Sequence, residues 1–95
     1  MAKAYLVAHI RIHDKQKFEE FKAMSGPAIA EYGGRVLVRN PSPEHQEGEL
    51  RGLTIIIEFT DMETAQRFYH SDAYTAARKV RELAAETDLM LVEGV

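Results

Sequence analysis

The sequence predicts an α+β fold in which four antiparallel strands form one sheet and the helices cover one of its faces. Two patterns support this prediction. Short segments alternate apolar and other residues, which is typical of half-buried strands. The segments between them repeat apolar residues every three or four positions, which is typical of amphipathic helices. The segments follow one another as β-α-β-β-α-β, the split βαβ order. A chain of 95 residues is expected to form a single domain over residues 1–95.

Residues 4–12 are expected to form the first strand, because they alternate with a period of two. The apolar face, which should meet the helices, comprises Ala4, Leu6, Ala8, Ile10 and Ile12. The opposite face comprises Tyr5, Val7, His9, Arg11 and His13. Tyr5 and Val7 are too apolar to suit open water, so this face is expected to have a second partner.

Asp14 is expected to cap a first helix, since its side chain can accept hydrogen bonds from free backbone N–H groups. The Gly26-Pro27 pair should kink this helix or restart it, with Pro27 in the first turn. Gly33-Gly34 should end it. The core-facing stripe of this helix comprises Phe18, Phe21, Ser25, Ala28, Ile29 and Tyr32.

Residues 35–40 and 53–59 are expected to form the two middle strands. The polar, proline-bearing segment 40–49 between them is expected to be a mobile loop or a loose hairpin extension. Strict alternation in the first of these strands places Val36 and Val38 on one face and Arg35, Leu37 and Arg39 on the other. In the second, the residues facing the helices are Leu53, Ile55, Ile57 and Phe59, and those facing away are Thr54, Ile56 and Glu58.

Asp61 is expected to cap a second helix, which His70-Ser71-Asp72 interrupts, and Ser71 is expected to cap its continuation. The charged run 78–81 is interpreted as a solvated helix face, and residues 89–93 as a short last strand. The apolar stripe of the continued helix comprises Ala73, Ala76, Ala77, Val80, Leu83 and Ala84, beside a neighbouring stripe of Tyr74, Arg78 and Arg81.

The predicted helices leave one sheet face uncovered. That face carries Tyr5, Val7, Leu37, Thr54 and Ile56, together with one side of the last strand. An open face with this much apolar surface is usually an interface. We therefore expect a homodimer in which the open faces of two sheets pack together about a two-fold axis.

The composition excludes several classes of function. A net charge of −3 gives no strong attraction to nucleic acid or to an anionic membrane surface. No apolar run approaches the ~18 residues of a membrane span, so neither nucleic acid nor a membrane is an expected partner. The sequence contains no cysteine, which excludes disulfides and thiol catalysis. No signal peptide is recognised, and a cytoplasmic location is expected.

Motifs for cofactors and metals are also missing from the sequence. There is no glycine-rich phosphate loop and no glycine elbow around a serine, so neither a cofactor nor a nucleophilic triad is expected. His9 and His13 share one strand face but lie about 13 Å apart, which is too far for one metal ion. No metal site is expected.

At the level of whole motifs the chain resembles a known family. The matching residues are Tyr5, Pro27-Ala28-Ile29, Gly33-Gly34-Arg35, Glu58-Phe59, Ala65, Phe68-Tyr69, Ser71, Tyr74, Arg78 and Val92-Glu93-Gly94-Val95. Together they resemble the domain of unknown function 1330 family of the dimeric α/β-barrel superfamily. The resemblance implies a ferredoxin-like domain that forms a homodimeric α/β barrel. The superfamily includes small cofactor-independent monooxygenases, isomerases, haem enzymes and non-enzymatic binders, so the fold leaves the function open.

The first candidate site is the polar set on the uncovered face: His9, Arg11, Arg39 and Glu58. The first and third strands are expected to be neighbours, with the second beside the third, so His9, Arg39 and Glu58 should approach one another. A sheltered carboxylate beside an arginine and an imidazole is a candidate acid–base group. Glu58 or His9 would accept the proton and Arg39 would bind an anion. A purely structural ion pair between Arg39 and Glu58 explains the same residues.

The second candidate site lies at the helix junction and comprises Tyr69, Ser71, Tyr74 and Arg78. Tyr74 and Arg78 are neighbours on one helix face. Near the free N–H groups of the Ser71 cap they would hold the carboxylate or phosphate of a substrate. Capping by Ser71 and packing of the two tyrosines explain the same residues without a ligand.

Two hypotheses about function remain open. In the first, the protein binds or converts a small organic molecule without a cofactor, in a pocket between sheet and helices that His9, Arg39, Glu58, Tyr69 and Tyr74 line or border. In the second, it is a non-catalytic dimeric module, structural or regulatory, whose polar residues only fix the register of the interface.

Overall fold

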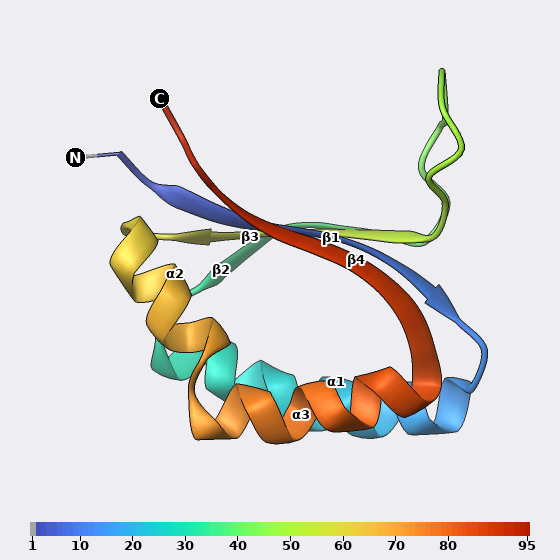
Figure 1. Cartoon of the computed structure of the whole chain (residues 1–95), viewed down its shortest axis with the longest axis horizontal. Coiled ribbons are helices and arrows are strands. Elements are labelled where there is room, and N and C mark those ends of the chain that lie inside the picture. The colour runs from blue at the N-terminus through green and yellow to red at the C-terminus, as the bar shows by residue number, and fades with distance from the viewer. Residues whose placement is uncertain (1) are drawn as a thin grey trace.

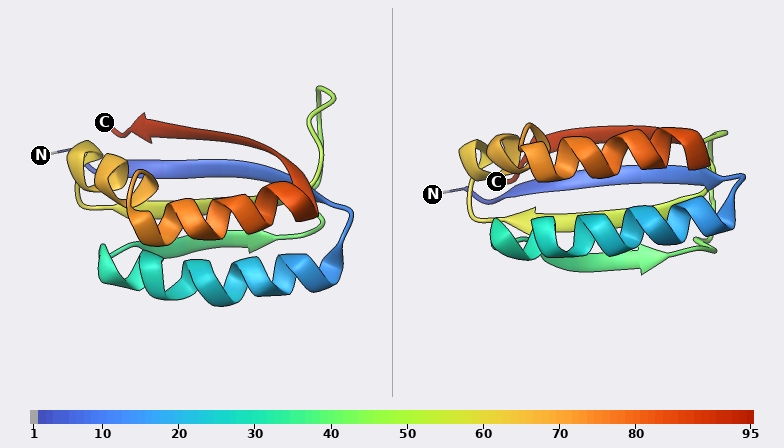
Figure 2. Two further views of the ribbon diagram at one scale, coloured as in Figure 1. Left: turned by 60° about the horizontal axis from the view of Figure 1, so that its bottom comes forward. Right: turned by 90° about the horizontal axis from the view of Figure 1, so that it is seen from below.

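The computed structural model describes residues 2–95 and contains one four-stranded sheet and three helices. The elements are β1 (Ala4–Ile12), α1 (Lys15–Glu31), β2 (Arg35–Asn40), β3 (Leu53–Phe59), α2 (Met62–Tyr69), α3 (Asp72–Ala84) and β4 (Ala85–Glu93). The strands lie in the order β2-β3-β1-β4, and all neighbours are antiparallel. All three helices lie on one face of the sheet (Figures 1 and 2), which confirms the predicted α+β architecture.

The alternation of β1 positions the core as predicted. Ala4, Leu6, Ala8 and Ile10 are buried against the helices, while the residues between them point to the open face. A row of aromatic rings fills the space between sheet and helices, because rings pack well edge to face or tilted. The row runs through Phe18, Phe21, Tyr74, Phe68 and Phe59.

All three helices begin at the caps that the sequence predicts. The side chain of Asp14 accepts a hydrogen bond from the Lys17 N–H (3.0 Å). Asp61 accepts one from the Thr64 N–H (2.8 Å). Ser71 accepts one from the Tyr74 N–H (3.2 Å) in the same way. Each bond satisfies one of the donors that a helix start leaves free.

The expected restart of the first helix at Pro27 is not observed. Helix α1 runs without a break from Lys15 to Glu31, with Pro27 inside it. A proline inside a helix removes one backbone hydrogen bond and costs about 3 kcal/mol. Ser25 and Ala28, on either side of Pro27, are both buried against the same core. Packing of one continuous stripe therefore offsets the loss of that bond.

The predicted faces of β2 are wrong beyond its middle, because the strand contains a β-bulge. Val36 pairs with Ile57, whereas Val38 pairs with Ile56, so Leu37 is an extra residue that has no partner of its own. An extra residue reverses the alternation that follows it. Val38 consequently joins the open face, and Arg39 moves to the side of the helices.

The stripe predicted for the last helix is confirmed at Ala77 and Ala84 and is wrong at three other positions. The buried residues of α3 are Tyr74, Ala77, Arg81 and Ala84, whereas Ala73, Ala76 and Leu83 are exposed. The last strand starts at Ala85 rather than Leu89, directly after the helix. Its early start is fixed by β1: Ile12 pairs with Ala85, and the Ala84 carbonyl accepts hydrogen bonds from the N–H groups of His13 and Asp14.

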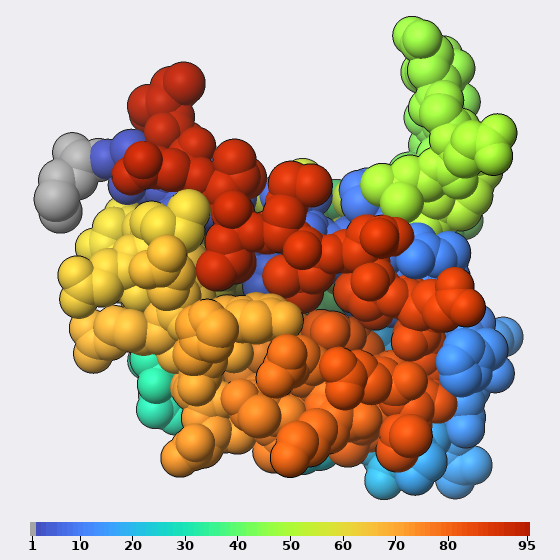
Figure 3. Space-filling model, in the orientation of Figure 1, coloured from blue at the N-terminus to red at the C-terminus, as the bar shows by residue number. Residues whose placement is uncertain are grey.

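The open face of the sheet is bordered by two projections. The segment 41–52, which joins β2 to β3, extends away from the sheet on the side opposite the helices (Figure 1). The end of β4 rises at the other end of the same face, and Figure 3 shows a hollow between the two. Within residues 2–95, no helix has the length and apolar character that crossing a bilayer requires.

Candidate functional site

A cavity of about 50 Å³ lies between the sheet and the helices. Apolar side chains of β1, β3 and β4 form its floor, and α1 and α3 form its roof. The apolar lining residues are Leu6, Ala8, Ile10, Phe18, Phe21, Ile29, Val36, Leu53, Ile55, Ile57 and Leu89. The polar or charged lining residues are Lys22, Ser25, Arg39, Tyr74 and Arg81. A cavity of this size has room for water or a small organic group.

Arg81 is the most unusual of these residues, because it is a charged side chain that is only 5% exposed. One guanidinium nitrogen, Nη1, donates a 2.7 Å hydrogen bond to the hydroxyl of Tyr74. The guanidinium carbon lies 5.8 Å from the centre of the Phe21 ring, within cation–π range. Nε is buried and has no hydrogen-bond partner. None of the ion pairs formed within residues 2–95 includes Arg81.

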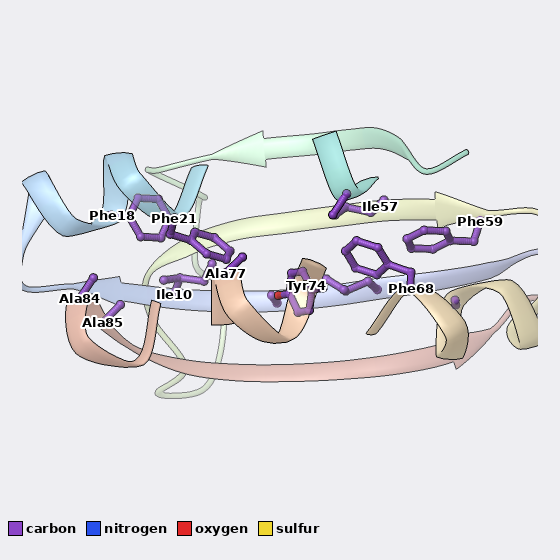
Figure 4. Close-up of a cluster of buried hydrophobic side chains, with 14 of the residues drawn as sticks. Ile10, Phe18, Phe21, Ile57, Phe59, Phe68, Tyr74, Ala77, Ala84 and Ala85 are labelled. Atoms are coloured by element: carbon purple, nitrogen blue, oxygen red, sulfur yellow. The ribbon is translucent and has the colours of Figure 1, made fainter. Parts of the chain in front are cut away.

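Tyr74 holds its hydroxyl beside Arg81 because its ring is packed from two sides. The ring centre lies 6.3 Å from that of Phe21 and 4.5 Å from that of Phe68 (Figure 4). Burial raises the pKa of the Tyr74 hydroxyl above its ordinary value, although the charge of Arg81 acts in the opposite direction. The phenol is therefore neutral at physiological pH. Its oxygen accepts from Arg81, which leaves its own proton for another acceptor.

The remaining polar groups of the cavity are also donors. The buried Ser25 hydroxyl makes only a long 3.5 Å hydrogen bond to the Lys22 carbonyl. Lys22 and Arg39 are exposed and stand where the cavity meets an outer groove of about 360 Å³. The groove is lined by Ile12, Lys15, Phe18, Glu19, Lys22, Arg39, Pro41 and Leu53. The cavity itself has no aspartate, glutamate, histidine, asparagine or glutamine in its lining.

The first predicted site is not assembled as expected. The bulge in β2 carries Arg39 to the cavity side, and Arg35 is the residue opposite Glu58. His9 pairs with Thr54, four residues along β3 from Glu58, which is about 13 Å. The expectation that His9, Arg39 and Glu58 approach one another is therefore corrected, while a role for each of them separately stays a prediction.

Each open-face member of that set has its own local partners. The Glu58 carboxylate accepts from Lys3 Nζ (3.3 Å) and from the Tyr5 hydroxyl (3.4 Å). His9 Nδ1 lies 3.3 Å from the Thr54 hydroxyl. Arg11 pairs with Asp88 at 2.7 Å and with Glu86 at 3.9 Å, and also donates to the Arg51 carbonyl. These contacts account for the polar groups of Glu58, His9 and Arg11 without a ligand.

The second predicted site is assembled in part. Arg78 Nη1 donates to the Tyr69 hydroxyl (3.3 Å), and its guanidinium carbon lies 5.3 Å from the centre of the Tyr69 ring. The Ser71 hydroxyl is occupied, since it accepts from the Tyr74 N–H and donates to the Phe68 carbonyl (2.7 Å). Tyr74 points into the cavity beside Arg81 rather than toward a shared ligand with Ser71.

Reasoning from the sequence missed Arg81, because a charged run was interpreted as a solvated face. One signal was available. Tyr74 and Arg81 are seven residues apart, which is two helical turns, and Ala77 and Ala84 share their stripe. Two small residues on that stripe let α3 approach α1 closely and enclose the longer side chains. Within residues 2–95, no group of three or more histidine, aspartate or glutamate side chains is placed to hold a metal ion.

Comparison with known proteins identifies a family and a fold. The model of a family described as "Domain of unknown function (DUF1330)" matches residues 3–95. No curated protein is similar enough in sequence to count as a relative. Among solved structures, a protein of unknown function from Rhodopseudomonas palustris is similar at 16% identity with a TM-score of 0.82, and the match covers 99% of this chain and 83% of that one.

Two further structures are similar over nearly their whole length. A dimeric ferredoxin-like protein of unknown function from Jannaschia sp. is 13% identical with a TM-score of 0.74, covering 97% of this chain and 99% of that one. SnoaB, a cofactor-independent oxygenase from Streptomyces nogalater, is 12% identical with a TM-score of 0.71, covering 100% of this chain and 95% of that one. At these identities the likeness establishes a shared fold.

Proposed function

The chain belongs to the domain of unknown function 1330 (DUF1330) family, and from that premise we propose that it is a homodimeric protein that binds a small organic molecule without a cofactor. The binding site is the cavity between the sheet and the helices. Concave, mainly apolar sites with a few convergent polar groups are the usual form of small-molecule sites. The observation that carries the proposal is the buried Tyr74–Arg81 pair at the wall of an otherwise apolar cavity.

Binding is favoured over acid–base catalysis by the chemistry of the lining. A general base must lie within hydrogen-bond reach of the proton that it removes. The cavity lining includes no carboxylate and no imidazole, and the raised pKa of Tyr74 makes its phenolate scarce at neutral pH. SnoaB, which has a similar fold, is described as a cofactor-independent oxygenase. That description supports a small-molecule site in this fold and leaves the reaction to be tested for this chain.

The open sheet face supports the homodimer. Three of its large apolar side chains, Leu37, Met90 and Val92, are between 43% and 56% exposed in the isolated chain. Exposed apolar patches of this kind mark interfaces. The structurally similar protein from Jannaschia sp. is described as dimeric. A second copy, placed face to face about a two-fold axis, would enter the hollow between the segment 41–52 and the end of β4 (Figure 3).

The first experiment combines native mass spectrometry with a fragment screen. Native spectra of the purified protein are expected to give a dimer, with any retained ligand as added mass. Fragments of about six heavy atoms or fewer, added at millimolar concentration, are expected to shift the NMR signals of Ala8, Ile55 and Leu89 at the cavity wall. A monomer would overturn the proposed dimer. A screen in which no fragment shifts these signals would overturn the binding site.

A matched pair of variants checks that the fragments enter the cavity. Ala8 lines the cavity, so Ala8→Leu is expected to fill it and abolish the shifts. Ala76 is exposed on α3, so Ala76→Leu makes the same chemical change away from the cavity and is expected to preserve them. Equal loss in both variants would contradict the assignment of the site.

A further inference from the structure

We infer that the ligand of this cavity carries a carboxylate, which Arg81 and Tyr74 receive at its inner wall. The inference rests on the proposed binding function and adds the chemical class of the ligand. It also assigns Arg81, Tyr74 and the rim residues Lys22 and Arg39 separate parts in recognition.

The charge of Arg81 is the first argument. Removing a guanidinium from water is costly unless an opposite charge accompanies it. Arg11, which is half-buried on the open face, pairs with two carboxylates, Asp88 and Glu86. Arg81 is more deeply buried and pairs with none within residues 2–95. The less buried Arg11 therefore has two carboxylate partners, whereas the more deeply buried Arg81, which lines a cavity, has none within residues 2–95.

Hydrogen bonding is the second argument. Arg81 Nε is buried and unpartnered, and the Tyr74 oxygen already accepts from Arg81, so its proton is available for an acceptor. Both residues line the cavity. The Nε–H of Arg81 lies on the edge of the guanidinium away from Nη1, which Tyr74 occupies. That edge matches the two oxygens of a carboxylate, which arginine binds through adjacent N–H groups. Within residues 2–95, no carboxylate lines the cavity to compete with such a ligand for Arg81.

The rest of the cavity indicates what the carboxylate is attached to. Its floor and roof are aliphatic and aromatic and its volume is about 50 Å³, so the remainder of the ligand is a small aliphatic group. The outer groove is lined by three positive residues, Lys15, Lys22 and Arg39, and by the carboxylate of Glu19, which pairs with Lys22 at 2.8 Å. The remaining two positive charges, those of Lys15 and Arg39, raise the local concentration of anions.

The test compares acids with their uncharged amides of nearly equal shape. Acetate and acetamide, and isobutyrate and isobutyramide, are titrated into the protein while the NMR signals of the cavity wall are followed. Each acid is expected to bind at least about tenfold more tightly than its amide, since a charge-assisted hydrogen bond is stronger than a neutral one. In Arg81→Met the acids are expected to lose at least about tenfold in affinity while the amides bind as before. Arg78→Met, which removes an arginine from the same helix but outside the cavity lining, should change neither.

The outcomes separate this inference from the proposed function. Equal affinity for acid and amide would overturn the carboxylate and leave cavity binding intact. No binding of either would overturn both. A preference for acids that survives Arg81→Met but disappears in Arg39→Ala would place the anion at the rim and overturn the assignment to Arg81. If Arg81→Met does not fold, Arg81→Lys keeps the charge but loses the planar fork. That variant is expected to weaken acid binding severalfold, and unchanged affinity would count against the inference.

Discussion

The guanidinium of Arg81 donates a 2.7 Å hydrogen bond to the hydroxyl of Tyr74, two turns earlier on the same face of α3. Both residues are buried at the wall of the cavity, and no carboxylate within residues 2–95 pairs with the guanidinium. Buried charges are costly even when they are hydrogen-bonded. We therefore expect this pair to serve the binding properties of the cavity rather than the stability of the fold.

The double variant Tyr74→Phe/Arg81→Met is expected to be more stable than the natural protein in the absence of ligand. Replacing a buried charged group by apolar side chains of similar size raises stability by about 1–4 kcal/mol in comparable cases. Urea unfolding followed by circular dichroism measures the difference. Arg81→Met alone is expected to be less stable than the double variant by about 1–3 kcal/mol, since it leaves the Tyr74 hydroxyl without a partner. A double variant that loses stability would identify the pair as structural.

Glu58→Gln is expected to weaken the dimer and leave the cavity unchanged. Glu58 lies on the open face, where its carboxylate binds Lys3 and Tyr5 and is only 17% exposed. Removing the charge leaves Lys3 without a partner when the second copy covers this face, so the dimer dissociation constant should rise roughly threefold to tenfold, the range for one partly buried pair. Sedimentation equilibrium measures this constant. If Glu58→Gln instead lost fragment binding while the dimer stayed intact, Glu58 would be identified as a residue needed for ligand binding.

The pH dependence of stability is expected to contain a contribution from Asp61. Hydrogen bonds from Thr64 to the carboxylate lower the pKa of Asp61 in the folded chain below its ordinary value of 3.8. A lowered folded pKa means that this contribution is fully present above pH 5 and is lost as the pH falls through 3.8 toward the folded value. Asparagine also caps helices but does not titrate. The advantage of the natural protein over Asp61→Asn in urea unfolding should therefore shrink between pH 6 and pH 2.5, and a constant difference would contradict the assignment.

Gly52→Ala is expected to be strongly destabilising. Gly52 has φ of 116°, and a Cβ there would lie 2.5 Å from the Ile10 carbonyl oxygen, which belongs to the backbone of β1. Gly48 also has positive φ, 88°, but a Cβ there would meet no atom within 4 Å. Gly48→Ala therefore reports the backbone strain without the clash. The loss of unfolding free energy should be about 2–4 kcal/mol larger for Gly52→Ala, and equal losses would show that the loop moves to relieve the contact.

The strands and helix starts were predictable because each depends on a local signal. The strict alternation in residues 4–12 reproduces β1 to the residue. Asp14, Asp61 and Ser71 mark the three helix starts through hydrogen bonds to residues only three positions away. Signals of this kind require no knowledge of the rest of the chain, so the sequence alone is sufficient to reveal them.

The cavity was harder to predict, because its residues are positioned by tertiary contacts. The bulge at Leu37 follows from the pairing of β2 with β3, and nothing in the alternation of residues 35–40 announces it. The burial of Arg81 contradicts the ordinary preference of arginine for water. It becomes visible only when α3 is seen packed against the sheet. Both errors concern residues that line the cavity, Arg39 and Arg81. Functional sites are where structure departs most often from the expectation given by local sequence patterns.

The bulge in β2 also makes the chemistry of the two sheet faces depend on the register of one strand. Deleting Leu37 would remove the bulge but keep Val38 opposite Ile56 and Arg39 opposite Ile55, so both side chains would stay on their present faces. If the same six residues instead paired without the bulge, Arg39 would leave the mouth of the cavity for the opposite face, and Val38 would take its place beside Ile55. A shift of one residue in the pairing of β2 would thus remove a positive charge from the entrance and add it to the surface on which a second copy is proposed to pack, without altering any residue of the sequence.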